Sequence, residues 1–448
     1  NLIKMSKTNL LVLPNQLFDI KYFKKNNITP TSHNITLYEH PQYFTKYKYN
    51  KKKLLLHYAS LDYYTKYLKD NGFKVDLIKY NKNLSLKDYD MFRSGDNLTN
   101  LKPDKVFDSP NYLLNTELHD KYSKKTDKFM FGSFYTWAKK ELDIIPNIKS
   151  KDKENRKRMP DDVQIPNIKK LDKSDYEFIK NNVKNVENNF KNNYGNTENF
   201  IYPVTHKSAK LFLKNFIKYK FINFGPYQDF IKKGESFMFH SVLSSSINIG
   251  LINPIDIIET IKKYEDKVPV NSYEGYIRQL FWREYQLYCY NYIDYKSELK
   301  KPFFNYKNKL DKSWYDGTTG NELIDDTIKK GFDTAYLHHI ERLMVIGNYM
   351  NLTEIKPEDG IKWFIEFAID SYEWVMYQNV YDMVFFVTAK TMRKPYITSD
   401  NYLLKMSNYK KGEWSKDWKE LYYKFLKKHK EKLEKYPRTF PPSILKKL

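Results

Sequence analysis

Several hydroxyl residues follow a histidine in the segment His240-Ser-Val-Leu-Ser-Ser-Ser246. A helix that begins here would offer free backbone N–H groups and the positive end of its dipole, which both favour a phosphate. An ordinary helix N-cap explains the same residue types without a ligand. The segment is therefore a candidate phosphate site that needs support from the rest of the chain.

A second candidate lies in the aromatic and basic stretch from 273 to 285. Helical spacing places Arg278 and Trp282 on one face, with Gln279 and Arg283 on the neighbouring face. A tryptophan flanked by arginines can stack on a base or a flavin ring. It can equally belong to a core whose arginines extend to solvent.

Two adjacent histidines, His338 and His339, form the third candidate. Neighbouring helical residues point about 100° apart, so the pair cannot easily share one metal ion. No cysteine or third histidine stands nearby at a helical spacing. Acid–base chemistry suits the pair better than metal binding, and a histidine that simply caps a core helix is the alternative.

Asp370 lies in an aromatic-rich stretch between Trp363 and Trp374. A carboxylate buried in such surroundings needs a hydrogen-bonding or charged partner. The pattern therefore indicates a partner for Asp370 elsewhere in the chain.

The elements that must position these residues differ between the two halves of the chain. The first 135 residues or so alternate short apolar runs, expected as strands at 9–13, 34–38, 54–57 and 73–78, with helical spacing at 59–70. This alternation predicts a parallel, doubly wound α/β sheet. We expect an α/β domain over 1–140, a solvated connector over 141–200 and an all-helical domain over 201–448. The expected helices of that last domain span 207–219, 255–264, 273–292, 323–350, 357–375 and 416–433.

Composition limits the possible functions. The 448 residues carry a formal net charge of +23, which favours a polyanion such as nucleic acid, although codon bias toward Lys and Asn weakens that argument. The single cysteine, Cys289, excludes disulfides and any four-cysteine metal site. No apolar run reaches the length of about 18 residues that a membrane span needs, and the start resembles no secretory signal. We therefore expect a soluble intracellular protein, in the cytoplasm or a nucleus-like compartment.

The ordered set of motifs along the chain resembles the photolyase/cryptochrome family, and especially its bacterial (6-4) photolyase branch. The segments that carry this resemblance are 11–17, 39–44, 51–59, 152–160, 202–209, 224–229, 240–244, 250–254, 277–285 and 336–345. The resemblance implies an α/β antenna domain followed by a helical domain that holds FAD. It also implies light-driven electron transfer from reduced flavin to a pyrimidine lesion flipped out of DNA.

Specific residues take roles from this resemblance. Those implied to surround the FAD phosphates are Tyr227, His240, Ser241, Leu243 and Ser244. The resemblance implies that Arg342 and Asp370 contact the isoalloxazine ring.

The resemblance also implies how a lesion is handled. His338 and His339 match the pair that helps to move a proton at a (6-4) lesion, so they are the expected catalytic residues. Substrate contacts are expected from Gln279, Trp282 and Arg283. The residues expected to carry electrons to the flavin are Trp363, Trp374, Trp314 and Tyr315.

One departure from the branch is plain. Its usual members hold an iron–sulfur cluster with four cysteines, but the matching stretch 408–418 contains none. We therefore expect FAD, no iron–sulfur cluster and no other bound metal, with Trp414 and Trp418 filling the space. A ribityllumazine is the antenna that the branch implies.

Two functions follow from the resemblance. The favoured one is a DNA-repair enzyme, a deoxyribodipyrimidine photolyase-type lyase that acts on (6-4) photoproducts rather than cyclobutane dimers. The alternative is a cryptochrome-like blue-light receptor that binds FAD without repair, and a DNA-binding remnant with empty pockets is a third reading. For the enzyme we expect UV-damaged DNA as the partner, no membrane association and a monomer.

Overall fold

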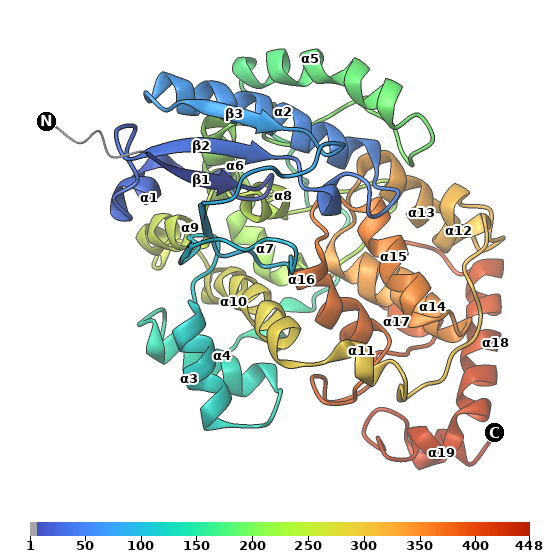
Figure 1. Ribbon diagram of the computed structural model, residues 1–448. Coiled ribbons are helices and arrows are strands. Elements are labelled where there is room, and N and C mark those ends of the chain that lie inside the picture. Colours follow the sequence, from blue (N-terminus) through green and yellow to red (C-terminus); the bar gives the residue numbers. More distant parts are fainter. Residues whose placement is uncertain (1–6) are drawn as a thin grey trace, which may run out of the picture.

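A parallel β-sheet opens the chain in the computed structural model, which describes residues 7–448 (Figure 1). Its strand order is β3-β2-β1-β4-β5, and every neighbouring pair is parallel. The strands are β1 (Thr8–Val12), β2 (His33–Tyr38), β3 (Val75–Ile78), β4 (Asp90–Phe92) and β5 (Lys105–Phe107). The order turns in both directions from β1, so the expected doubly wound sheet is confirmed.

Residues 54–57, expected as a strand, lie in helix α2 (Lys51–Asp70), so that prediction was wrong. Asn50 caps the helix by accepting a hydrogen bond from the Lys52 N–H. All residues from Lys52 to Leu61 are buried, so the apolar run has no exposed side. A short run of this kind has no periodicity that distinguishes a buried strand from a buried helix.

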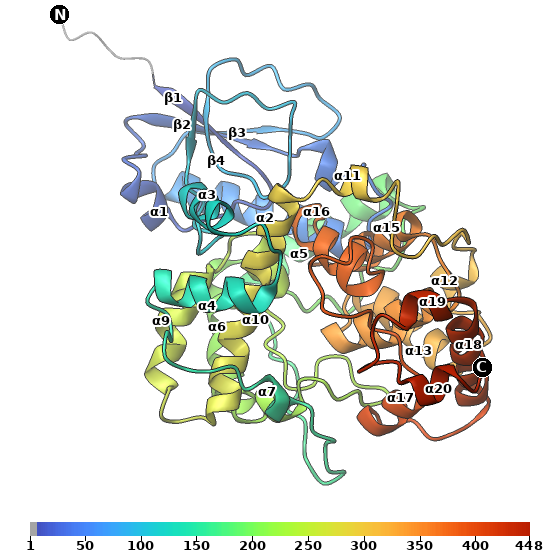
Figure 2. The same ribbon diagram turned by 90° about the horizontal axis from the view of Figure 1, so that it is seen from below.

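The connector carries one long helix, α5 (Lys173–Asn189), which packs along α2 (Figure 1). Before it, residues 142–172 form loops, turns and one short 3-10 turn, η2 (Asp152–Asn155). Two further helices, α3 (Thr116–Lys125) and α4 (Phe131–Glu141), leave the sheet region. Figure 2 shows α4 beside α10 (Val270–Tyr292), and the two helices are in contact. The end of the predicted antenna domain thus packs on the helical half.

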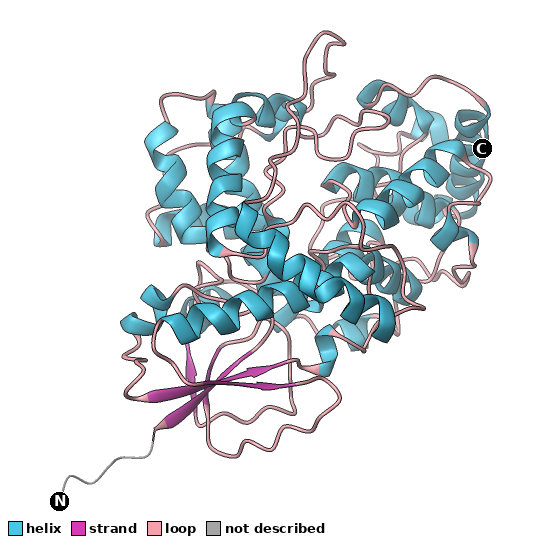
Figure 3. Cartoon of the chain, turned by 90° about the horizontal axis from the view of Figure 1, so that it is seen from above, coloured by secondary structure: helices cyan, strands magenta, loops and turns pink. Residues whose placement is uncertain are grey.

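The remainder of the described chain is largely helical, as Figure 3 shows. Its main helices are α6 (His206–Tyr219), α7 (Phe221–Tyr227), α8 (Ser244–Asn248), α9 (Pro254–Ile261), α10, α13 (Glu322–Thr334), α15 (Pro357–Phe367), α17 (Asp400–Met406) and α18 (Glu413–Lys428). This confirms the expected fold class, an α/β sheet followed by an all-α half. Within residues 7–448, no helix has both the length and the apolar character to cross a membrane.

Two of the expected long helices are interrupted. The stretch 323–350 breaks after α13, where Ala335 adopts a left-handed conformation with φ 56°, and resumes as the π-helical segment η4 (Glu341–Gly347). The stretch 357–375 breaks between α15 and the short helix α16 (Glu373–Met376). The Ile369 N–H donates to the Ala335 carbonyl at 2.9 Å, so the two breaks face each other. Asp370 directly follows Ile369 at this contact.

Candidate functional site

A buried ion pair joins the two breaks. Arg342 Nη1 and Nη2 donate to Asp370 Oδ1 and Oδ2 at 2.9 and 3.1 Å, a bidentate arrangement. Ser244, the first residue of α8, donates to Asp370 Oδ2 at 2.6 Å. The structure therefore brings together three residues that the sequence placed at a cofactor site, and it supplies the partner that Asp370 was expected to need.

The charges of this pair are held in place from several directions. Burial alone would raise the pKa of Asp370, but Arg342 and the Ser244 hydroxyl hold that pKa below its ordinary value. Arg342 Nε also donates to the Leu337 carbonyl at 2.6 Å. Asn248 Nδ2 donates to the Asp370 carbonyl at 2.8 Å, a contact that the sequence did not predict. Asp370 is thus a carboxylate at neutral pH, fixed through both its side chain and its backbone.

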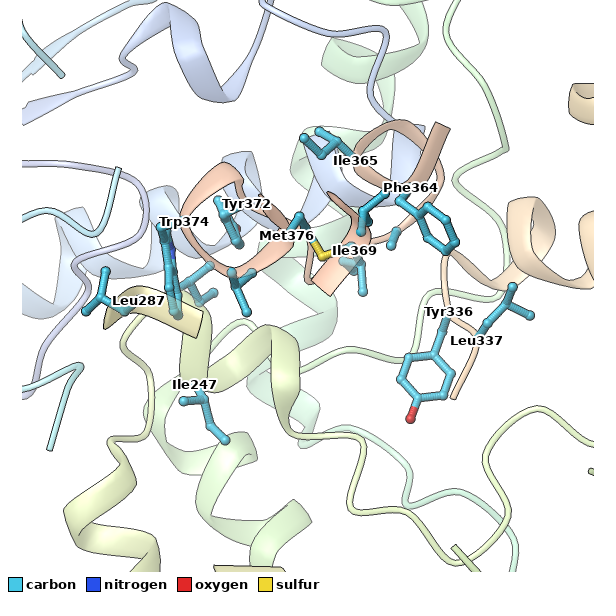
Figure 4. Close-up of a cluster of buried hydrophobic side chains, with 14 of the residues drawn as sticks. Ile247, Leu287, Tyr336, Leu337, Phe364, Ile365, Ile369, Tyr372, Trp374 and Met376 are labelled. Atoms are coloured by element: carbon cyan, nitrogen blue, oxygen red, sulfur yellow. The ribbon is translucent and has the colours of Figure 1, made fainter. Parts of the chain in front are cut away.

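Apolar side chains surround the Asp370 segment, as Figure 4 shows for Phe364, Ile369 and Tyr372. All three are buried in the hydrophobic core. The Arg342 guanidinium lies 5.4 Å from the centroid of the Phe367 ring. A charge or hydrogen bond placed here acts in surroundings that screen it far less than water does.

The residues expected around a phosphate form a second group. Tyr227, at the end of α7, packs its ring against Phe239 with centroids 5.8 Å apart. Ser241 shares a hydrogen bond of 3.0 Å with the Tyr276 hydroxyl. Leu243 is fully buried immediately before α8. These residues lie around the turn that contains His240. Ser244, by contrast, uses its hydroxyl group to donate a hydrogen bond to Asp370.

The two adjacent histidines have different surroundings. His338 is 2% exposed, and its ring stacks on that of His240 with centroids 5.0 Å apart. His339 is exposed, although the protein around it and the charge of Arg342 lower its pKa to about 4. Of the expected catalytic pair, therefore, only His339 is accessible to a substrate.

The three residues of α10 that were expected to contact a lesion differ in their exposure. Trp282 is partly buried, with one ring face against Phe131 at a centroid distance of 3.7 Å and an angle of 11°. Gln279 is partly exposed on the same helix. Arg283 is 8% exposed and points inward, where it donates to Asn248 Oδ1 at 2.9 Å and to the carbonyl of Asn111 at 2.6 Å. The donors of Arg283 are thus used inside the protein, unlike those of an exposed residue that contacts a substrate.

Not all of the aromatic residues expected as an electron relay lie close to one another. Trp363 Nε1 donates to the Trp314 carbonyl at 2.6 Å. Phe332 lies between Trp363 and Tyr315, with centroid distances of 5.6 and 5.9 Å. Trp374 lies elsewhere, 5.2 Å from Tyr112 at the edge of the sheet. Three of the four residues thus form one contact chain.

An antenna pigment would be expected at the carboxyl ends of the strands, where ligands of such sheets usually bind, but side chains occupy the ends of β1 and β4. Asp96 accepts hydrogen bonds there from the Tyr43 hydroxyl at 2.9 Å and from the Trp374 N–H at 3.0 Å. A Cβ added at Gly95 would lie 2.8 Å from the Trp374 ring. Side chains therefore fill this spot, whereas a cavity of about 600 Å³ lies nearby, lined by Tyr38 at the end of β2 and by Tyr80 and Leu84 after β3.

Tryptophans pack the stretch that corresponds to the cluster of the bacterial branch. Trp414 and Trp418 are 3% and 0% exposed, and their indole N–H groups donate to the carbonyls of Lys410 and Thr398. Cys289 is buried in α10. Among residues 7–448, no group of three or more His, Cys, Asp or Glu side chains is arranged to hold a metal ion.

Comparisons with known proteins agree with this architecture. The family of deoxyribodipyrimidine photo-lyase-related proteins matches residues 10–94 and 96–202. A (6-4) photolyase of Agrobacterium fabrum is 33% identical over 279 residues, which cover 58% of this chain and 54% of that protein. The chain is therefore similar to members of the photolyase/cryptochrome family. It spans about half the length of this curated relative.

Two solved structures of photolyase/cryptochrome proteins share the fold. A bacterial class III photolyase from Agrobacterium tumefaciens superimposes with a TM-score of 0.58 over 100% of this chain and 93% of that one. A cryptochrome of Synechocystis gives a TM-score of 0.61 over 90% and 88%. Both are 14% identical to this chain, so these likenesses concern the fold alone.

Photolyases and cryptochromes generally bind FAD, and the residues present here fit such a cofactor. His240 Nε2 and both ring nitrogens of His338 are buried without a hydrogen-bond partner among the described residues. Buried polar atoms are almost always paired, so these nitrogens indicate a missing polar partner. The Arg342–Asp370 pair adds a cation and an anion side by side. This donor set suits a ligand that carries both phosphates and a polar ring.

Proposed function

We propose that this protein is an FAD-dependent photolyase that repairs DNA, with the (6-4) photoproduct as its substrate. The observation that carries the proposal is the Arg342–Asp370–Ser244 cluster beside an exposed histidine, His339. The (6-4) photolyase that matches this chain supports the substrate. UV-damaged DNA is accordingly the proposed partner, and a monomer is the proposed state.

The chain's own residues would hold the cofactor from two sides. Arg342 and Asp370 are fixed side by side and would contact the ring, while Tyr227, His240 and Ser241 lie at the turn that would take the phosphates. Bound in its reduced form, FAD supplies the electron that light transfers to the lesion. Because Arg342 and Asp370 need no rearrangement, the surroundings of the ring are set before the electron moves.

Lesion handling is assigned to His339, Trp282 and Gln279. Repair of a (6-4) photoproduct requires that a hydroxyl return from one base to the other, and this step needs an acid. His339 is the exposed histidine of the pair, so we assign the proton donation to it. Trp282, braced on one face by Phe131, can stack the flipped base on its other face. His338 is then a positioning residue rather than a catalytic one.

Electron supply to the flavin is assigned to Trp363, followed by Trp314 and Tyr315. Phe367 lies 4.7 Å from Trp363 and touches the Arg342 side of the site. Tyr315 in turn stacks on Tyr194 at 4.7 Å, so the contact chain continues beyond the residues that the sequence suggested.

Substitution of Trp363 tests this route. Trp363→Phe keeps the packing but raises the oxidation potential of the ring, so we expect light-driven flavin reduction to slow at least severalfold. Trp374→Phe is the matched control, because Trp374 lies outside the contact chain. Time-resolved absorption after blue-light excitation measures the rate. Equal slowing by both substitutions would contradict the assignment.

A cryptochrome-like receptor that binds FAD without repair is the second candidate function, because a cryptochrome of Synechocystis shares the fold. Both functions require a flavin, so the purified protein should absorb blue light. Oligonucleotides with a single (6-4) photoproduct or a cyclobutane dimer then decide between the functions. We expect light-dependent loss of the (6-4) product only, and repair of neither lesion would favour the receptor.

A further inference from the structure

Lys220 is a buried cation that forms no salt bridge with any of the residues 7–448. It follows α6 directly and is 2% exposed. Its Nζ donates to the His240 carbonyl at 3.4 Å, and in the described part of the chain no carboxylate lies within 4.0 Å of it. Burial lowers the pKa of Lys220 to about 8, so the amine is still mostly charged at pH 7. Such a charge is costly unless an anion accompanies it.

Other buried lysines are better satisfied. Lys52, also 2% exposed, donates to the carbonyl and the side-chain oxygen of Asn196. Lys53, 1% exposed, donates to the Ser371 carbonyl and lies over the rings of Tyr49 and Tyr372. Lys220 has one long hydrogen bond instead. The difference indicates that its surroundings are completed by something other than this chain.

The ring of His240 beside Lys220 has the same deficit. Its Nε2 is buried without a partner among the described residues, and so are both ring nitrogens of His338, on which it stacks. Burial and the neighbouring cations lower the pKa of His240 well below its ordinary value. Hydrogen-bond donors and positive charge therefore meet at one place with no acceptor to receive them.

We propose that Lys220 and His240 together bind a phosphate group of the dinucleotide cofactor. An anion here would neutralise the buried ammonium and accept charge-assisted hydrogen bonds from it. The backbone phosphates of DNA cannot reach an amine that is 2% exposed, so the ligand is a small molecule enclosed by the protein. This inference rests on the proposed function and assigns a cofactor contact, Lys220, that no sequence motif suggested.

Binding of two different flavins can distinguish a contact to the phosphates from contacts to the rest of the cofactor. FAD carries a pyrophosphate and riboflavin carries none, so their dissociation constants for the apoprotein are compared by flavin fluorescence. Lys220→Met should weaken FAD binding at least about tenfold, or 1.4 kcal/mol, and change riboflavin binding less than about threefold. His240→Phe, which keeps the ring stack but removes the nitrogens, should show the same selective loss. Lys218→Met, an exposed lysine two residues earlier, is the control.

The stability of the apoprotein provides an independent readout. Removal of an uncompensated buried charge should leave the melting temperature of apo Lys220→Met equal to or above that of wild type. A lysine with only a structural role would give a lower melting temperature and equal losses for both flavins, and that result would overturn the inference. If wild-type protein bound no FAD at all, the proposed function would fail instead.

Discussion

Asp370→Asn is expected to abolish flavin binding and to destabilise the protein. The substitution keeps the shape of the side chain but leaves the Arg342 guanidinium, whose side chain is 13% exposed, without its anion. Removing one partner of a buried ion pair costs about 3–5 kcal/mol. Chemical denaturation of the apoprotein measures that loss, and the absorption of the purified holoprotein measures bound flavin.

A double substitution separates the two effects. Arg342→Met combined with Asp370→Leu replaces the ion pair by apolar groups, which often restores the stability that a single substitution removes. We expect the double variant to recover most of the free energy of unfolding and still to bind no flavin. If it bound flavin as tightly as wild type, the pair would have only a structural role.

Acid should weaken the same interaction. Because the folded-state pKa of Asp370 is lowered, the pair contributes fully above the ordinary carboxyl pKa of about 4. Its contribution is then lost as the pH falls through the folded-state value. Neutral conditions are therefore the right ones for comparing the variants.

The fold could be predicted from the sequence where one pattern dominated. The alternation of strands and helices gave the parallel sheet, and spacings of three and four gave most of the helices. The pattern failed at 54–57, because α2 is buried on every side there and shows no polar face. The helical spacing also predicted continuous helices across the two breaks at Ala335 and around Asp370. The apolar residues of these buried loops keep a spacing similar to that of a helix, so the sequence pattern does not show where the helices end.

These breaks explain why the candidate site was only partly predictable. Asp370 was identified by residue type, but the position of its segment beside the other helix break depends on the hydrogen bond between Ile369 and Ala335, two residues without a chemical signature. The inward direction of Arg283 was not predictable either, because its partner Asn111 lies 172 positions earlier in the chain. Lys220 escaped notice since only burial, and no motif, distinguishes it from the other lysines.

His339→Ala is expected to remove (6-4) repair while leaving lesion binding nearly intact. A positioned general acid contributes about 10²–10⁴-fold to a rate, so the yield of repair per absorbed photon should fall by at least about 100-fold. The exposed position of His339 means that its removal creates no buried cavity. Repair of a bound (6-4) oligonucleotide under saturating light measures the loss, and a binding titration with the same oligonucleotide is the control.

The pH dependence of repair distinguishes an acid from a residue that only contacts the lesion. The pKa of His339 is lowered to about 4, so the protonated form is a small fraction at pH 7 and increases as the pH falls. Repair per bound lesion should therefore rise between pH 8 and pH 5 in wild type and lose this slope in His339→Ala. His338→Ala should keep the slope, because that ring is buried against His240 and acts only by positioning. A slope lost in His338→Ala but kept in His339→Ala would transfer the proton donation to the buried histidine.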